Sequence, residues 1–244
     1  MEQWGITDCG KLRADNQDVF KILFDEEKKI SILVVCDGIG GARAGNVASA
    51  LAADAFMQSM GRYVENIGSI DDTADRMSQA VSTANKVVHE KSLQGDDYAG
   101  MGTTLTAAVS TFEGEVVVNI GDSRAYHITR DAIKQVTKDH TVVEELIARG
   151  EISRDQGREH PSKHLITRAL GSYRTELPDV FYLSLEPGDF ILLCTDGLTD
   201  VITDEEILSQ LKRKTSVQES CESLLELALS RGAPDNVTVA VFKK

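Results

Sequence analysis

The chain has 244 residues, of which 41% are hydrophobic, which is enough for one sizeable core. Its formal net charge is -13 and Lys and Arg form no cluster, which argues against nucleic acid or an anionic membrane surface as a partner. The start has no leader-like segment, no apolar stretch reaches the roughly 18 residues of a membrane helix, and the four cysteines have no close pairing. We therefore expect a single domain (1–244) in the cytoplasm.

In chain order, the first half predicts three strands, two helices and three more strands. Apolar runs predict strands at 3–8, 18–24 and 30–36 and, later in the chain, at 103–111, 115–120 and 123–129. Small residues at helical spacing predict a helix at 45–60, and a second helix is predicted at 73–91. The third strand reads as buried on both faces and ended by an Asp-Gly turn. The last three are expected to pair antiparallel, with a tight break at Gly121-Asp122.

The second half opens with a polar segment with few apolar anchors, 141–175, which we predict to be a mobile surface flap that begins with a short helix. Strands are predicted at 181–185 and 189–195, and a last strand at 237–242. Between the last two of these strands, capping-box spacing places helix starts at Thr203 and Ser216. The elements together predict an α+β fold, a four-layer α-β-β-α sandwich of two antiparallel sheets flanked by helices.

Five aspartates lie far apart in sequence, and four of them adjoin strongly apolar runs: Asp18, Asp37, Asp122, Asp196 and Asp235. Carboxylates gathered at one rim of a sheet repel each other, and divalent cations are their natural partners. An Asp-Gly pair such as Asp37-Gly38 is most often a turn, but the pattern recurs at Asp196-Gly197. Oxygen ligands without a Cys or His cluster favour Mg²⁺ or Mn²⁺ over Zn²⁺, and ligand type alone leaves Ca²⁺ open.

A positive group would be needed to hold an anionic substrate beside such a site. Arg13 lies five residues before the first aspartate of the set and can bind a phosphate in fork geometry. Taken by itself, the segment favours a solvated loop arginine.

The chain resembles the metal-dependent protein phosphatases of type 2C, and most closely the compact bacterial members. The resemblance covers nearly the whole chain, on eight collinear motifs: Arg13 with Asn16-Gln17-Asp18, Asp37-Gly38-Ile39-Gly40-Gly41, Gly102-Thr103-Thr104, Asn119-Ile120-Gly121-Asp122-Ser123-Arg124, Thr137-Lys138-Asp139-His140-Thr141, Thr167-Arg168-Ala169-Leu170-Gly171, Thr195-Asp196-Gly197-Leu198 and Pro234-Asp235-Asn236.

The resemblance implies a role for each matching residue. Asp37 would bridge two Mn²⁺ or Mg²⁺ ions, with the Gly38 carbonyl as a further ligand. Asp196 and Asp235 would complete the shell of one ion, and Asp18 would hold the other largely through water. Arg13 would bind the substrate phosphate, Asn236 would orient Asp235, and a third, weaker ion site would use Asp122 with Asp196, with Asp200 as a candidate ligand.

The implied activity is hydrolysis of phosphoserine and phosphothreonine in proteins by a metal-activated water, without a phosphoenzyme. The implied partners are phosphorylated proteins, among them a bacterial Ser/Thr protein kinase and its substrates, and we expect a monomer. Two positions depart from the family. Gln17 stands where many relatives have Glu, and Ile39 stands where eukaryotic members often have a His, so the general acid stays open between a metal-bound water, His140 and His164.

Three other functions compete with this interpretation. A catalytically silent relative would act as a binding module, but it should have lost ligands that this chain keeps. A regulatory phosphatase dedicated to one phosphoprotein would catalyse the same reaction but would not act as the general partner of a Ser/Thr kinase. A plain acidic calcium-binding protein should carry local D-x-D-x-D-G loops, which the sequence lacks.

Overall fold

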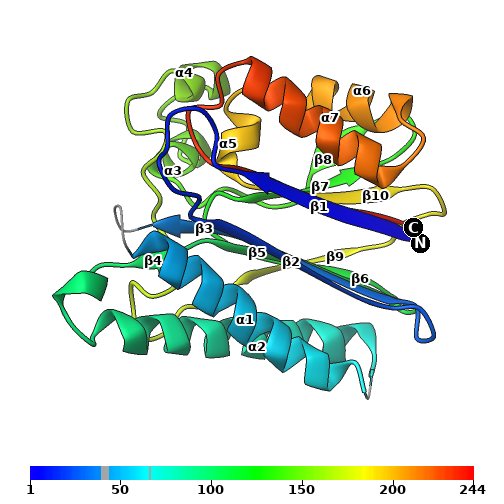
Figure 1. The fold of residues 1–244 in the computed structure, drawn as a ribbon, viewed down its shortest axis with the longest axis horizontal. Coiled ribbons are helices and arrows are strands. Elements are labelled where there is room, and N and C mark those ends of the chain that lie inside the picture. The colour runs from blue at the N-terminus through cyan, green and yellow to red at the C-terminus, as the bar shows by residue number, and fades with distance from the viewer. Residues whose placement is uncertain (40–43, 66) are drawn as a thin grey trace.

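The computed structural model describes residues 1–39, 44–65 and 67–244. Two antiparallel sheets face each other and helices cover both outer faces, which confirms the predicted four-layer sandwich (Figure 1). The two chain termini lie side by side at one end of the sandwich, because Glu2 pairs with Lys243 across two neighbouring strands. Within the part of the chain that is described, no helix is long and apolar enough to span a membrane.

The first sheet joins the two ends of the chain. Its strands lie in the order β1 (Glu2–Asp8), β11 (Val237–Lys243), β10 (Phe190–Cys194), β7 (Arg124–Ile128) and β8 (Ile133–Gln135). Its outer face carries α6 (Asp204–Arg213) and α7 (Val217–Ser230), whose apolar side chains share one buried cluster with those of β7, β10 and β11. A single turn of helix, α5 (Asp196–Thr199), follows β10 directly.

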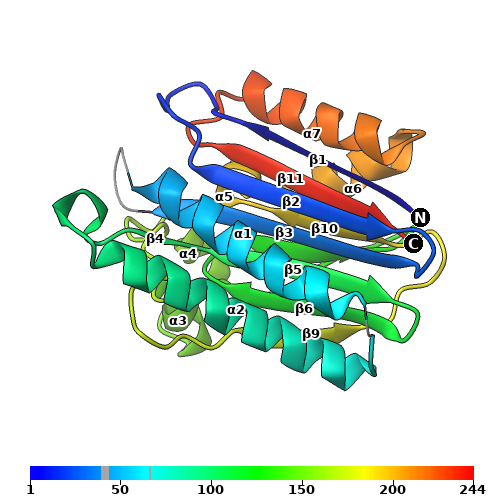
Figure 2. The same cartoon turned by 60° about the horizontal axis from the view of Figure 1, so that its bottom comes forward.

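The second sheet is covered by two long helices, which Figure 2 shows crossing it side by side. Its strands lie in the order β2 (Asp18–Asp25), β3 (Ile30–Ile39), β5 (Leu105–Thr111), β6 (Gly114–Ile120) and β9 (Asp179–Leu183), with β4 (Gly102–Thr103) paired to the end of β3. The helices are α1 (Gly45–Tyr63) and α2 (Ile70–Ser92), followed by a short 3₁₀ turn at Asp96–Tyr98.

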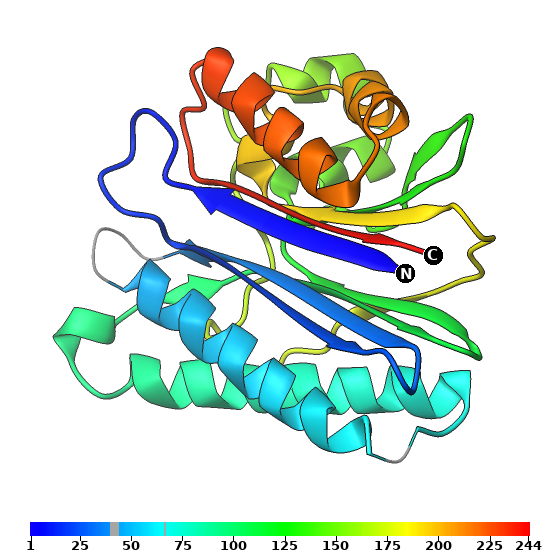
Figure 3. The same ribbon diagram turned by 45° about the vertical axis from the view of Figure 1, so that its right-hand side comes forward.

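The strand β3 is buried on both faces, as its continuous apolar run predicts. Ile32 and Val34 pack under α1 and α2, whereas Leu33 and Val35 belong to the cluster between the two sheets. Figure 3 shows the two long helices on one face of this sheet and the other sheet on its opposite face. Alternation along the strand therefore supplies two different cores, because successive side chains leave opposite faces of a sheet. This double burial fixes the position of the residues at the end of β3.

Both predicted helix starts are confirmed. Thr203 and Glu206 form a reciprocal capping box at the start of α6. At α7 the Ser216 hydroxyl accepts the Glu219 N–H, while the Glu219 carboxylate turns to Thr215 instead. Such caps depend on neighbours in sequence alone, which is why the sequence predicts them well.

Three local predictions are wrong, each because a distant strand decides the outcome. β3 does not end in a turn at Asp37-Gly38 but continues to Ile39, where it pairs with β4. The predicted strand 103–111 is two strands, β4 and β5. β6 and β7 do not pair, because the chain crosses from one sheet to the other at Gly121-Asp122.

The segment predicted as a flap lies at the end of the sandwich opposite the termini (Figure 1). It begins with α3 (Val142–Ala148), capped by the Thr141 hydroxyl, and also contains the unpredicted α4 (Arg154–Arg158). The bridge between Thr141 and Ile166 closes it into a loop. Its mobility stays a prediction.

Candidate active site

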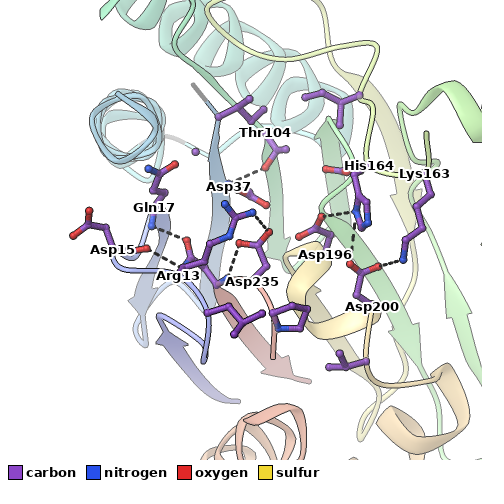
Figure 4. A pocket seen from close by; sticks show the side chains of 18 of the residues that line it. Arg13, Asp15, Gln17, Asp37, Thr104, Lys163, His164, Asp196, Asp200 and Asp235 are labelled. Atoms are coloured by element: carbon purple, nitrogen blue, oxygen red, sulfur yellow. Dashed lines mark hydrogen bonds and ion pairs between the residues drawn. The ribbon is translucent and has the colours of Figure 1, made fainter. Parts of the chain in front are cut away.

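A cavity of about 940 Å³ opens at the flap end of the sandwich and collects six of the seven predicted site residues (Figure 4). These are Arg13, Asp37, Gly38, Asp122, Asp196 and Asp235. The seventh, Asp18, is only 5% exposed. Of the Asp37-Gly38-Ile39-Gly40-Gly41 motif, Gly40 and Gly41 lie outside the described residues. The predicted site therefore forms one cluster, although its members span 222 positions of sequence between Arg13 and Asp235.

Strand register explains how Asp18 meets Asp37. Asp18 is the first residue of β2 and lies directly opposite Asp37 of β3 in the antiparallel pair. Directly opposed residues have Cβ atoms about 4.5–5.5 Å apart, so the two carboxylates are close neighbours. From the other sheet, the Thr195 and Thr238 hydroxyls donate to Asp18 Oδ2 at 2.8 and 2.7 Å.

The Gly102-Thr103-Thr104 motif holds the backbone of Asp37. The Asp37 N–H donates to Thr104 Oγ1 at 2.9 Å, and the Asp37 carbonyl accepts from Thr103 Oγ1 at 2.8 Å. Gly38 follows in close contact with the start of α1, where any Cβ would overlap the Gly45 carbonyl. The pairing with β4 and the missing Cβ thus set both the direction of the Asp37 side chain and the path of the Gly38 carbonyl.

The remaining acids come from three chain connections. Asp196 opens α5 after β10, Asp235 lies between α7 and β11, and Asp122 lies in the crossing between the two sheets. Gly197 packs against the Asn236 carbonyl so closely that a Cβ would overlap it. This contact brings the Asp196 and Asp235 segments together.

Asn236 bonds to Asp235 through its backbone and to the loop that carries Arg13 through its side chain. Its side chain does not bond to Asp235; it accepts the Gln17 N–H at 2.8 Å and donates to the carbonyls of Cys9 and Asp15 at 2.9 and 3.0 Å. Only its backbone N–H donates to Asp235 Oδ1. The amide side chain therefore fixes the loop that carries Arg13, because a single amide supplies both donors and an acceptor at a loop crossing.

The electrostatics of the cluster suit divalent cations. Asp18 Oδ1 and Asp196 Oδ1 are buried, and neither has a hydrogen-bond donor within the described part of the chain. Burial raises the pKa of Asp18 and of Asp122 to about 7, and burial with the charge of Asp18 raises the pKa of Asp37 well above its ordinary value. Buried acceptors without donors are costly, so the donor set of hard oxygens fits Mg²⁺ or Mn²⁺.

Arg13 bonds to one of the acids. Its Nη2 lies 2.6 Å from Asp235 Oδ2, and this hydrogen bond raises the pKa of Arg13 further. The Arg13 side chain is 57% exposed, so it can turn toward a ligand in the cavity. Lys163, which the sequence analysis did not single out, also lines the cavity and lies 3.4 Å from Asp200 Oδ1.

The two histidines left open as acids have different surroundings. His164 lines the cavity, with Nδ1 3.8 Å from Asp196 Oδ2 and 3.7 Å from Asp200 Oδ2. The Asp196 carboxylate favours the protonated imidazole and raises the pKa of His164, and the three side chains together could hold a cation. His140 is only 8% exposed, and burial lowers its pKa.

Comparison with known proteins agrees with this geometry. The Protein phosphatase 2C family model matches residues 11–233. The chain belongs to this family. The serine/threonine phosphatase stp of Listeria innocua is 34% identical over 98% of this chain and 94% of its own length. PstP of Mycobacterium tuberculosis, a serine/threonine protein phosphatase, is 37% identical over 96% of this chain and 43% of its own length.

Solved structures of the family have the same fold. The S. agalactiae serine/threonine phosphatase superposes with a TM-score of 0.90 at 31% identity, over 100% of this chain and 99% of its own. The catalytic domain of PstP in complex with two manganese ions superposes with a TM-score of 0.83 at 34% identity, over 98% of this chain and 96% of its own. The chain is thus a PP2C-type serine/threonine protein phosphatase, a hydrolase of a metal-dependent family.

Proposed function

We propose that this phosphatase hydrolyses phosphoserine and phosphothreonine in proteins with two divalent ions, Mn²⁺ or Mg²⁺, held by Asp18, Asp37, Gly38, Asp196 and Asp235. The main support is the pair of buried carboxylate oxygens, Asp18 Oδ1 and Asp196 Oδ1, that lack donors among the described residues. When bound, such ions lower the pKa of a water so that hydroxide is available near neutral pH. The two manganese ions of the PstP catalytic domain support the same stoichiometry here.

The residues of the chain would then bind and orient the substrate. Arg13 would give up its hydrogen bond to Asp235 and bind two phosphoryl oxygens, because the two N–H groups of a guanidinium match two oxygens of a phosphate. The Asn236 amide would keep the Arg13 loop against the metal ligands during this exchange. The Arg13 guanidinium would then stabilise the negative charge that develops on the phosphoryl group.

The proton for the leaving alkoxide has one candidate imidazole in the cavity, His164. Both ring nitrogens of His140 face protein atoms, Gly121 N on one side and Asp179 Oδ2 on the other. Of the two histidines, His164 is therefore the one that can deliver a proton to a substrate, alongside metal-bound water. The nearby Asp122, Asp196 and Asp200 would supply a third, weaker ion site.

The biological proposal is that the enzyme reverses a bacterial Ser/Thr protein kinase, acting on the kinase and on its substrates. The bacterial Ser/Thr phosphatases among its relatives support this assignment. We propose that residues 1–244 form one catalytic domain that works as a monomer in the cytoplasm.

The test is phosphate release from a phosphothreonine peptide by chelator-treated protein, titrated with Mn²⁺, Mg²⁺ and Ca²⁺. Mn²⁺ or Mg²⁺ should restore turnover, and Asp37→Asn should abolish it while leaving the protein folded. Asp97→Asn, an exposed acid outside the cavity, is the matched control. If the ions bind but no metal restores turnover, the catalytically silent binding module replaces this proposal.

A further inference from the structure

The turn that carries Asp122 is held on both sides by one buried histidine. The Gly121 N–H donates to His140 Nδ1 at 3.0 Å, and the His140 N–H donates to the Gly121 carbonyl at 3.0 Å. Gly121 has φ +102° and packs on Thr104, where a Cβ would overlap the threonine side chain. Glycine adopts many other conformations as readily, so this one is selected by the two bonds with His140 and by the Asn119 amide, which donates to the Gly121 carbonyl at 3.2 Å.

The far side of the imidazole is fixed by charged groups. Because Nδ1 accepts a hydrogen bond, the ring proton lies on Nε2 and points to Asp179 Oδ2 at 3.2 Å. Arg168 Nη1 donates to the other oxygen of Asp179 at 2.7 Å and also lies 2.9 Å from His140 Nε2, so Asp179 accepts from both groups. The Gly121 N–H therefore sets the tautomer of His140, and Asp179 accepts from the protonated Nε2 on the other side of the ring.

The same histidine also anchors the end of the flap. The Thr167 N–H donates to the His140 carbonyl at 2.7 Å. The flap thus leaves the body of the protein just after His140 and returns at Thr167, bonded to the residue that holds Gly121. Along this segment, His164 and Ile166 line the cavity.

We propose that His140 is a positioning residue: through Gly121 it fixes the Asp122 carboxylate for a metal ion and it joins the returning end of the flap to the same turn. The inference rests on the proposed metal-dependent function. It gives a role to the Thr137–Thr141 and Thr167–Gly171 motifs, which supply no ligand.

Two substitutions by amide side chains distinguish the roles of the two ring nitrogens of His140. His140→Asn places an amide oxygen near the position of Nδ1 and can still accept the Gly121 N–H. His140→Gln reaches toward Asp179 and leaves Gly121 without its acceptor. Mn²⁺ binding to the full chain, measured by titration calorimetry without substrate, should weaken on the order of tenfold in His140→Gln and less than about twofold in His140→Asn.

A double-mutant cycle with Asp122→Asn tests whether the effect passes through that carboxylate. Asp122→Asn alone should weaken Mn²⁺ binding, and adding His140→Gln to it should cause no further loss. Equal binding by His140→Gln and the unchanged protein, full additivity of the two losses, or unchanged binding by Asp122→Asn would each overturn the inference. A merely structural role would lower the unfolding temperature of both His140 variants alike without a difference in Mn²⁺ affinity.

The two proposals fail differently. An unchanged chain without phosphatase activity would remove the proposed function, while the binding cycle would still report on His140. An active chain in which both His140 variants bind Mn²⁺ alike would remove only the inference.

Discussion

The buried Asp18 should destabilise the metal-free protein at alkaline pH. Burial raises its pKa from 3.8 to about 7, against the opposing hydrogen bonds from Thr238 and Thr195. Between those two values the folded protein keeps a proton that the unfolded chain has released, so stability falls as pH rises and the loss is complete above about pH 7. We therefore expect Asp18→Asn, which is always neutral, to stabilise the metal-free fold.

The size of the effect follows from the shift of about three pKa units. At about 1.4 kcal/mol per unit, the Asp18 carboxylate costs at most about 4 kcal/mol at pH 8 and less than about 2 kcal/mol at pH 5. Since 1 kcal/mol moves the unfolding temperature of a chain of this length by roughly 2–4 °C, Asp18→Asn should raise it by up to about 16 °C at pH 8. The gain at pH 5 should be less than half as large.

Thermal unfolding in the presence of a chelator, at pH 5 and pH 8, measures this difference directly. Repeating the scans with Mn²⁺ should reverse the order at pH 8, because the ion stabilises the chain that keeps the Asp18 carboxylate more than the Asp18→Asn chain. Asp97→Asn, which is exposed and does not line the cavity, should change the unfolding temperature at neither pH. If Asp18→Asn lowers the unfolding temperature at both values alike, burial does not raise the pKa of Asp18 and the reasoning is refuted.

Gly197→Ala should lower the unfolding temperature by several degrees in thermal scans, because its Cβ would overlap the Asn236 backbone carbonyl, whereas Gly61→Ala, with nothing within 4 Å, should stabilise α1 by up to about 1 kcal/mol. Equal effects at the two glycines would contradict the packing argument. Asn236→Ala frees the loop that carries Arg13, so the KM for a phosphopeptide should rise on the order of tenfold with a smaller change in kcat. An unchanged KM in steady-state kinetics would show that Asn236 does not contribute to substrate binding.

The sequence predicts the layers and the positions of most elements because their signals are local. Alternating and continuous apolar runs, the capping boxes at Thr203 and Ser216, and the small residues of α1 need no knowledge of distant contacts. The errors occur where pairing is non-local. At Asp37-Gly38 the local signal for a turn is outweighed by hydrogen bonds to β4, which lies more than sixty residues later.

The site shows the same division. Most of the acids can be predicted from their repeated placement beside apolar runs, and the family resemblance assigns a role to each. The supporting residues carry no such signal. Asn236 and His140 belong to the matching motifs, but their bonds to Cys9 and Gly121 can be recognised only once the fold places these residues beside them.

The dispersal of the acids along the chain follows from the architecture. Asp18 and Asp37 belong to one sheet, Asp196 and Asp235 adjoin strands of the other, and Asp122 lies where the chain passes between them. A cation bound by this set would therefore join the two sheets, in addition to the threonine hydroxyls on Asp18 and the Asn236 amide on Gln17. Ion binding to the folded state then adds stability across the sandwich. For this reason we expect metal removal to loosen the flap end first, where five acids lose the charge that offsets their repulsion.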